Sequence, residues 1–380
     1  MNTAAKNSTW VMRVTCAILF LLFTFAYLYY YQGDTLAFVQ HILSGGKTHY
    51  DITVGAILIT LVLWLLQIGV FALTGLTKRL HALTYLPSVL LLALLTDLPD
   101  LEAGRLSMGM WAWGLPLALL SFGILAYFYA KFQPYEAEIS NYGVFSRLTW
   151  INVAILGGMF MFVGLMSLGN APFHYQLKME RYIAVGDYRK ALAVGSNASA
   201  DSALTMLQMH ALAATKGMGD HLFEYPLKGG SDAMLPTNVT PRLLMLPEKN
   251  IYRLVGVQTI QHMRPMEYIA WLRRHHLSGR SAGDYLLCGY LLDGRLDVFA
   301  QEVGHYYSMD NLPKHYKEAL TLYSHLRTHP VAVYHSTVMD ADFQDFQNIC
   351  RTTPKKQLFS KLKDVYGNTY WCYYYTRTHH

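Results

Sequence analysis

Charged residues are scarce in the first 169 residues of this 380-residue chain. This stretch holds 8 of the 31 Lys and Arg residues and 7 of the 25 Asp and Glu residues. Over the whole chain 15% of residues are charged, whereas a typical soluble domain has about 25%. The shortage excludes an ordinary water-soluble fold for the first part, while the charge content after residue 169 is that of a soluble domain.

Cysteine is also scarce, with four residues and no CxxC pair. This excludes a disulfide-rich scaffold and a cysteine-based zinc site. Cys16 lies in the first apolar run. In an oxidising compartment Cys350 would be able to pair with Cys288 or Cys372; the alternative is that all are small buried residues. HExxH is missing too, which argues against a histidine metal site. We expect no metal and no cofactor.

Five apolar runs predict a transmembrane helical domain over residues 1–169. A helix of about 20 residues crosses a hydrocarbon core of about 30 Å. The third run is the weakest, because Pro87 interrupts it. Ionisable side chains are missing from the middle of these runs, which argues against a transporter or channel. The predicted spans are residues 11–31, 52–75, 80–98, 110–130 and 149–168.

The positions of Lys and Arg predict the orientation of these spans in a cell inner membrane, because cations near span ends stay on the cytoplasmic side. With the N-terminus inside, five spans place the C-terminal half in the periplasm. If the third run is re-entrant, that half is cytoplasmic instead. With the N-terminus inside, the cations on the cytoplasmic side are Lys6, Arg13, Lys78, Arg79, Lys131 and Arg147, and those on the outer side are Lys47 and Arg105.

From residue 170 the pattern becomes helix, turn, helix. The stretch HYQLKMERYIAVGDYRKALAVG has large residues at helical spacing around a Gly-Asp turn, and a related outline recurs about 33 residues later. This resembles a tetratricopeptide unit. The fold we predict is therefore all-α, a transmembrane bundle followed by a tetratricopeptide-like α-solenoid over residues 170–380. The repeat positions are the aromatics Tyr175, Tyr182 and Tyr188, the small Ala191, and the turn glycines Gly186, Gly219 and Gly294.

Three further stretches of the second half carry a family resemblance. KGMGDHLFEYP, LPKHYKEAL and YGNTYWCYYY together resemble an uncharacterised family of bacterial multi-pass membrane proteins that contains a domain of unknown function. The resemblance covers mainly residues 170–380. It implies a C-terminal part similar to helical repeats, and it implies no activity.

Two sets of residues suggest enzymes. Gly279 to Gly283 spells G-x-S-x-G, but no strand is predicted before it, so Ser281 and Asp284 are better interpreted as a helix cap. The acidic residues Asp34, Asp97 and Asp100 lie in predicted outer loops, where a multi-pass glycosyltransferase using lipid-linked sugars would need a base.

The function we expect is a membrane-anchored scaffold that holds an envelope protein or peptide in the concave face of its repeats. In such stacks the first helix of each unit lines the groove, which makes Arg181 and His210 candidate partner-binding residues. The excess positive charge of the second half is scattered, so we expect no nucleic-acid partner. The expected partners are the lipid bilayer and a protein, and the alternative function is the glycosyltransferase.

Overall fold

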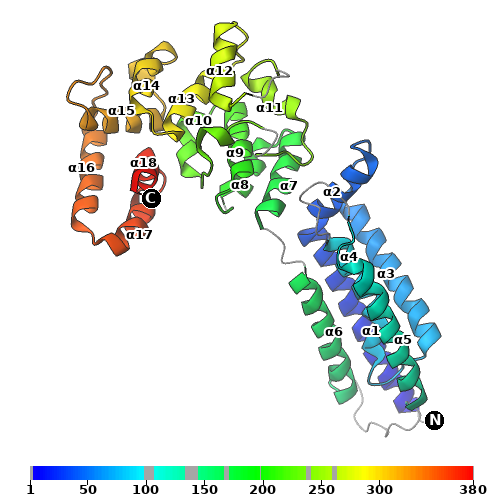
Figure 1. The fold of residues 1–380 in the computed structure, drawn as a ribbon. Helices are drawn as coiled ribbons and strands as arrows, with labels where there is room; N and C mark the ends of the chain where they lie inside the picture. Colours follow the sequence, from blue (N-terminus) through cyan, green and yellow to red (C-terminus); the bar gives the residue numbers. More distant parts are fainter. Residues whose placement is uncertain are drawn as a thin grey trace. The chain divides into compact units, whose positions relative to one another are not determined.

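A computed structural model describes residues 3–97, 107–132, 144–166, 171–196, 198–236, 241–258 and 263–379 (Figure 1). Over these ranges the chain is helical and contains no strand, apart from one isolated bridge between Gly256 and Ser278. The predicted all-α class is confirmed. The chain divides into two compact units, Met1–Phe173 and His174–His380.

The N-terminal unit consists of long apolar helices that lie alongside one another (Figure 1). The second long helix begins where the Asp51 carboxylate accepts a hydrogen bond of 2.9 Å from the Val54 N–H, and it ends at Gly75 in the left-handed conformation. The elements are α1 (Thr3–Ala26), the π-helical turn η1 (Tyr27–Tyr31), α2 (Gly33–Ser44), α3 (Ile52–Thr74), the 3-10 turn η2 (His81–Tyr85), α4 (Leu86–Thr96), α5 (Trp111–Phe132) and α6 (Arg147–Met166).

Within the described residues, four helices are long and apolar enough to cross a membrane: Thr9–Tyr31, Ile52–Thr74, Trp111–Phe132 and Arg147–Met166. The third predicted span is shorter than expected. It consists of η2 and α4, which together cover only His81–Thr96. Pro87 explains the change of helix type, because proline has no N–H to donate and fits only the first turn of an α-helix.

Asn152 of α6 joins three elements inside the N-terminal unit. Its Oδ1 accepts a hydrogen bond of 2.7 Å from the Ala82 N–H, and its Nδ2 donates to the carbonyls of Lys78 and Leu148. The same Nδ2 lies 2.9 Å from the sulfur of Met12 in α1. One buried amide thus connects α1, α6 and η2, together with the turn before η2.

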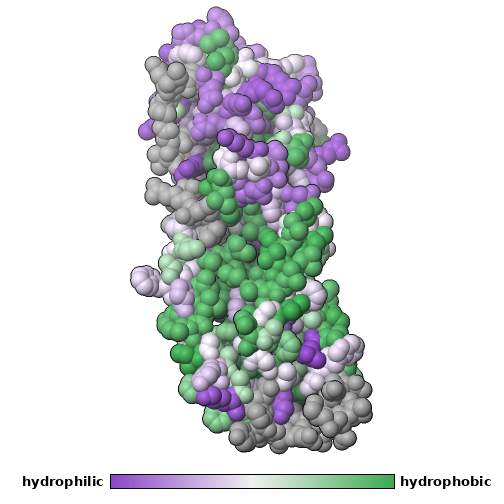
Figure 2. Space-filling view, turned by 90° about the vertical axis from the view of Figure 1, so that its right-hand side faces the viewer, coloured by the Kyte–Doolittle hydropathy of each residue, from purple (hydrophilic) through white to green (hydrophobic). Residues whose placement is uncertain are grey.

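The outer surface of these helices is hydrophobic, as Figure 2 shows for one face of the N-terminal unit. On α5, for example, Trp113 and Leu117 are largely exposed. A large exposed apolar surface is unfavourable in water but matches a hydrocarbon environment. The unit therefore has the surface of a membrane protein.

The C-terminal unit contains many shorter helices around one core. The core is built from Leu, Met, Tyr and Phe side chains contributed by almost every element. The elements are α7 (Ala171–Ala184), α8 (Tyr188–Ser196), α9 (Ser202–Thr215), α10 (Met218–His221), η5 (Leu222–Glu224), η6 (Gly230–Ala233), α11 (Glu248–Val255), α12 (Pro265–Arg274), α13 (Ala282–Leu292), α14 (Leu296–Glu302), η7 (Val303–His305), η8 (Met309–Asn311), α15 (Lys314–Leu326), α16 (Thr337–Thr352), α17 (Lys355–Tyr366) and α18 (Tyr370–His379).

Two of the three predicted turn glycines lie in turns. Gly186 between α7 and α8 has φ +79°, and Gly294 between α13 and α14 has φ +69°. Gly219 differs from the prediction, because it lies inside α10. There the turn forms earlier in the chain, at Lys216 with φ +59°, and the Gly217 N–H donates to the Leu212 carbonyl. The second copy of the pattern is thus shifted relative to the first.

The packing of the C-terminal unit also includes contacts between helices far apart in sequence. The short α10 packs against both α13 and α15, and α18 packs against α15. In a simple solenoid each repeat contacts only its neighbours. The C-terminal unit therefore combines helix pairs with long-range contacts that close the core.

Candidate functional site

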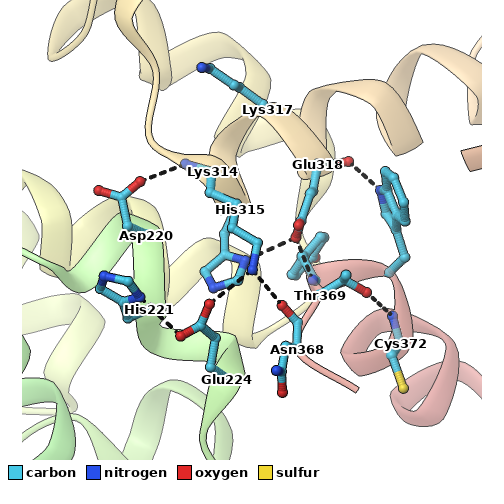
Figure 3. A network of polar contacts seen from close by, with 12 residues as sticks. Asp220, His221, Glu224, Lys314, His315, Lys317, Glu318, Asn368, Thr369 and Cys372 are labelled. Atoms are coloured by element: carbon cyan, nitrogen blue, oxygen red, sulfur yellow. Dashed lines mark hydrogen bonds and ion pairs between the residues drawn. The ribbon is translucent and has the colours of Figure 1, made fainter. Parts of the chain in front are cut away.

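Three segments of the C-terminal unit, residues 216–226, 312–320 and 366–375, meet in one network of polar contacts (Figure 3). We call this network the junction. Its segments are the ones that carry the family resemblance, although long stretches of chain separate them. The fold thus brings these three separate segments together in space.

Asp220 stabilises the start of α15 from a different part of the chain. Its Oδ1 accepts a hydrogen bond of 2.8 Å from the backbone N–H of Lys314, the first residue of that helix. A carboxylate at this end satisfies an unpaired N–H and interacts favourably with the helix dipole. The neighbouring Gly219 allows the approach, because a Cβ there would lie 2.7 Å from the Cβ of Pro313.

The side chain of Lys314 connects all three segments. Its Nζ donates to Glu224 Oε1 at 2.9 Å and to the carbonyl of Asn368 at 3.0 Å. Glu224 also contacts His221 Nδ1 at 2.9 Å. Burial tends to raise the pKa of Glu224, but the hydrogen bonds from Lys314 and His221 outweigh it and lower that pKa, so the carboxylate is ionised at neutral pH.

A buried pair, His315 and Glu318, lies at the centre of the junction. His315 Nδ1 is 2.9 Å from Glu318 Oε2, and the same oxygen accepts a hydrogen bond of 2.7 Å from the Tyr370 N–H. The Glu318 carbonyl accepts 2.8 Å from Trp371 Nε1. Because both side chains are almost fully buried, the pair ties α15 to α18 rather than facing solvent. The aromatic segment near residue 370 is therefore core, as is the side chain of Trp371.

A second arrangement surrounds the start of α13. A cavity of about 310 Å³ lies here, and its lining includes Arg273, Arg280, Asp284 and Tyr307. Arg273 also lines an adjoining cavity of about 420 Å³ together with Arg274. The guanidinium of Arg273 donates to Glu302 at 2.6 Å. Exposed arginine side chains thus line two neighbouring cavities.

The capping role predicted for Ser281 and Asp284 is wrong in detail. Ser281 is the N-cap residue of α13, but its side chain makes no capping hydrogen bond. Asp284 Oδ1 instead accepts from the hydroxyls of Tyr307 at 2.6 Å and Tyr316 at 3.2 Å. The Tyr316 hydroxyl is 3.4 Å from the sulfur of Cys288. Burial, with the charge of Asp284 adding to it, raises the pKa of this thiol, which stays protonated and unreactive.

The two predicted partner-binding residues have different surroundings. His210 in α9 is buried, and its ring packs edge-on against Tyr188 with 6.1 Å between centroids. Burial, with a contribution from Arg253, lowers the pKa of His210 to about 4, so the ring is neutral. It is not the exposed groove residue that the repeat pattern suggested. Arg181 in α7 is half-buried, with its guanidinium 5.4 Å from the ring centre of Tyr182.

The remaining repeat residues contribute to packing. Tyr175, Tyr182 and Tyr188 are partly buried against the C-terminal core, and Ala191 of α8 is fully buried. A small side chain at the contact of α8 with its neighbours is what the repeat pattern requires. These positions thus have packing roles in the first helix pair.

The acidic residues of the glycosyltransferase alternative come from two parts of the sequence, Asp34 from one and Asp97 and Asp100 from the other. Asp34 lies in the first turn of α2, half-buried. Asp97 follows α4, and its Oδ2 accepts a hydrogen bond of 2.9 Å from Trp111 Nε1. Asp100 lies outside the described residues. Asp97 thus has a structural role in joining the end of α4 to the start of α5.

The four cysteines are free thiols, and Cys16, Cys288 and Cys372 are buried while Cys350 is half-buried. Among the described residues, no three His, Cys, Asp or Glu side chains are grouped to hold a metal ion. Sequence reasoning missed the junction, because its parts are separated by long stretches with no shared period. The sequence shows the charged residues of LPKHYKEAL, but it does not show which distant residues they contact.

Comparison with known proteins gives one match. Residues 257–377 match a family of unknown function, DUF6057. This agrees with the resemblance to an uncharacterised family, and it covers α12 to α18 with two of the three junction segments. No curated protein and no solved structure matches the chain.

Proposed function

We propose that this protein is a multi-pass protein of a bacterial inner membrane whose C-terminal unit is a tetratricopeptide-like platform for an acidic segment of another envelope protein. The observation that carries the binding part is the pair of adjoining cavities that share Arg273. The membrane part is supported by the four long apolar helices.

Five crossings are favoured over four, because η2 and α4 follow α1 over most of its apolar length. Near one end of α1, the Asn152 amide contacts both Met12 and Ala82. Further along, the rings of Phe20 and Tyr85 are 4.9 Å apart. At the other end the hydroxyls of Tyr27 and Thr96 are 3.1 Å apart, after about 22 Å of helical rise from Met12. A segment that runs this far beside a span supports a fifth crossing.

With five crossings and a cytoplasmic N-terminus, the C-terminal unit is periplasmic. The cations Arg13, Lys78 and Lys131 then lie on the cytoplasmic side, as expected because cationic loops resist translocation. This orientation also puts the platform where envelope proteins are available as partners.

The repeat-like part of the proposal is supported by the two helix pairs α7–α8 and α13–α14. In both, the turn glycine has a positive φ, and the next residue donates its N–H back into the first helix: Asp187 to Tyr182 and Arg295 to Tyr290. The turn glycine also donates its own N–H, Gly186 to Ile183 and Gly294 to Leu291, and the two bonds together form the Schellman motif. The two helix pairs therefore share the same hydrogen-bonding pattern in their turns. The long-range contacts of α10 and α18 are additional to this repeated arrangement.

An acidic segment fits the surface between α12 and α13 because of its charge. Arg273, Arg274 and Arg280 are exposed at the rims of the two cavities, and His276 lines the second one. Guanidinium groups bind carboxylates in a bidentate way, which gives both affinity and orientation. Peptide carboxylates would therefore dock along this rim.

Site-specific photocrosslinking in cells tests the proposal. A photoreactive amino acid at Arg280 should capture a defined protein, and the same residue at the exposed Lys356 of α17 should not. The double change Arg273→Glu and Arg274→Glu should abolish capture without unfolding the chain. Capture that is equal at both positions, or unaffected by charge reversal, contradicts the proposed surface.

A further inference from the structure

A cavity of about 300 Å³ lies within the N-terminal unit, between α1, α3 and η2. We call it the basal cavity. Its walls combine aromatic rings with polar side chains. Its lining includes Trp10, Arg13, Gln67, Phe71, His81 and Tyr85.

The basal cavity lies at the ends of three apolar elements. Arg13 is near the start of the candidate span Thr9–Tyr31, and Phe71 is near the end of Ile52–Thr74. His81 is the first residue of the shorter apolar helix. Since apolar segments end where the hydrocarbon core ends, this cavity lies at the depth of the lipid head groups.

The chemistry of the cavity favours an anion with an apolar body. The Arg13 guanidinium lies 5.4 Å from the ring centre of Phe71, and its Nε donates to the Thr9 carbonyl at 3.3 Å. In the part of the chain that the structure describes, no carboxylate pairs with Arg13. Trp10 and Val14, on the same helix as Arg13, add apolar surface to the lining. An oriented guanidinium without an acidic partner is suited to phosphate.

The two polar neighbours are already held in place. Gln67 Nε2 donates to Thr84 Oγ1 at 2.9 Å, and His81 Nδ1 is 3.0 Å from the Leu76 carbonyl. His81 also packs edge-on against the rings of Phe71 and Tyr85. Gln67 and His81 are therefore held in place by contacts inside the N-terminal unit.

We propose that the basal cavity binds the head group of an anionic phospholipid, with the lipid phosphate on Arg13 and the glycerol end against Trp10. Its volume suits a head group rather than a whole lipid. Basic pockets between transmembrane helices bind phospholipid head groups in this manner. The inference rests on the membrane part of the proposed function and is independent of the partner-binding part.

The test uses the full chain in a non-ionic detergent, titrated with dioctanoyl phosphatidylglycerol and followed by native mass spectrometry. Wild type should bind this lipid at least about fivefold more tightly than dioctanoyl phosphatidylcholine. Arg13→Gln should weaken phosphatidylglycerol binding by about five- to tenfold, because one phosphate contact is lost. The matched control, Lys131→Gln at the end of α5, removes one cation outside the cavity and should leave binding unchanged.

Three results would overturn the proposal: equal binding of the two lipids, equal losses in Arg13→Gln and Lys131→Gln, or inorganic phosphate that competes as well as the lipid. If Arg13→Gln does not fold, Trp10→Ala replaces it, since Trp10 is 60% exposed and its loss leaves the helix packing intact. This variant should also weaken lipid binding, and unchanged affinity would reject the site. A chain recovered from cells without detergent would instead refute the membrane proposal itself.

Discussion

At the residue scale, Gly219 shows how one missing side chain allows two distant segments to meet. A Cβ at this position would lie 2.7 Å and 2.8 Å from two ring carbons of Pro313. A proline ring has little freedom to move away. Gly219 is therefore required for close approach, and not for the turn that the repeat pattern assigned to it.

We expect Gly219→Ala to lower the free energy of unfolding by about 1 to 3 kcal/mol, because the added methyl overpacks the contact. Alanine is the better helix former by up to about 1 kcal/mol, which reduces the loss but does not remove it. Denaturant unfolding of the full chain in detergent measures the change. The control is Gly304→Ala, where the nearest atom to an added Cβ is 3.7 Å away and the change should stay within about 0.5 kcal/mol.

His210 should make the C-terminal unit sensitive to mild acid. Its folded pKa of about 4 lies below the ordinary 6.5, because burial penalises the charged ring. As pH falls from 6.5 towards 4 the unfolded chain binds a proton that the folded chain does not, so stability decreases, by about 3 kcal/mol. Stability measured against pH should fall less steeply in His210→Gln than in wild type. Parallel curves would contradict the assignment.

At the element scale, Asn152 is the connection on which the packing of α6 depends. Replacing it by leucine leaves the Ala82 N–H and the Lys78 carbonyl without their side-chain partner. Hydrogen bonds between membrane helices contribute about 0.6 kcal/mol each on average, so Asn152→Leu should cost about 1 to 2 kcal/mol. Thermal unfolding in detergent measures this.

The control for that change is Ser121→Ala in α5, whose hydroxyl donates to Leu117 of its own helix. It removes a polar group from a span without removing a connection between helices. A similar loss of stability in both variants would mean that Asn152 has no special connecting role.

The elements differ in how far the sequence predicts them. Gly186 and Gly294 mark helix ends correctly, because glycine enters the left-handed conformation without steric cost. Lys216 adopts the same conformation although it is not a glycine, so the sequence pattern places the second turn at Gly219 instead. The burial of His210 depends on Tyr188 in a neighbouring helix, and no local pattern contains that information. The junction was not predictable for the same reason.

At the scale of the whole molecule, the number of crossings decides the side on which the C-terminal unit lies. In a background with the four cysteines changed to serine, single changes Arg79→Cys and Met108→Cys flank His81–Thr96. With five crossings, a membrane-impermeant maleimide added outside the inner membrane should label Met108→Cys and spare Arg79→Cys. Lys47→Cys, between α2 and α3, serves as the labelled control.

Equal labelling of the two positions would mean that His81–Thr96 enters and leaves the membrane on one side. The C-terminal unit would then face the cytoplasm. The envelope-partner proposal would fail with it, whereas the lipid site would remain testable.

The junction also sets an order of events during synthesis. Glu318 forms hydrogen bonds with Tyr370 and Trp371, and Lys314 forms one with Asn368. These contacts of the C-terminal core cannot form until those residues have left the ribosome. The apolar helices of the N-terminal unit emerge long before that. If they insert into a membrane as proposed, the growing chain is anchored before α18 can pack against α15. A nascent chain stalled before residue 368 would thus be tethered and protease-sensitive at once.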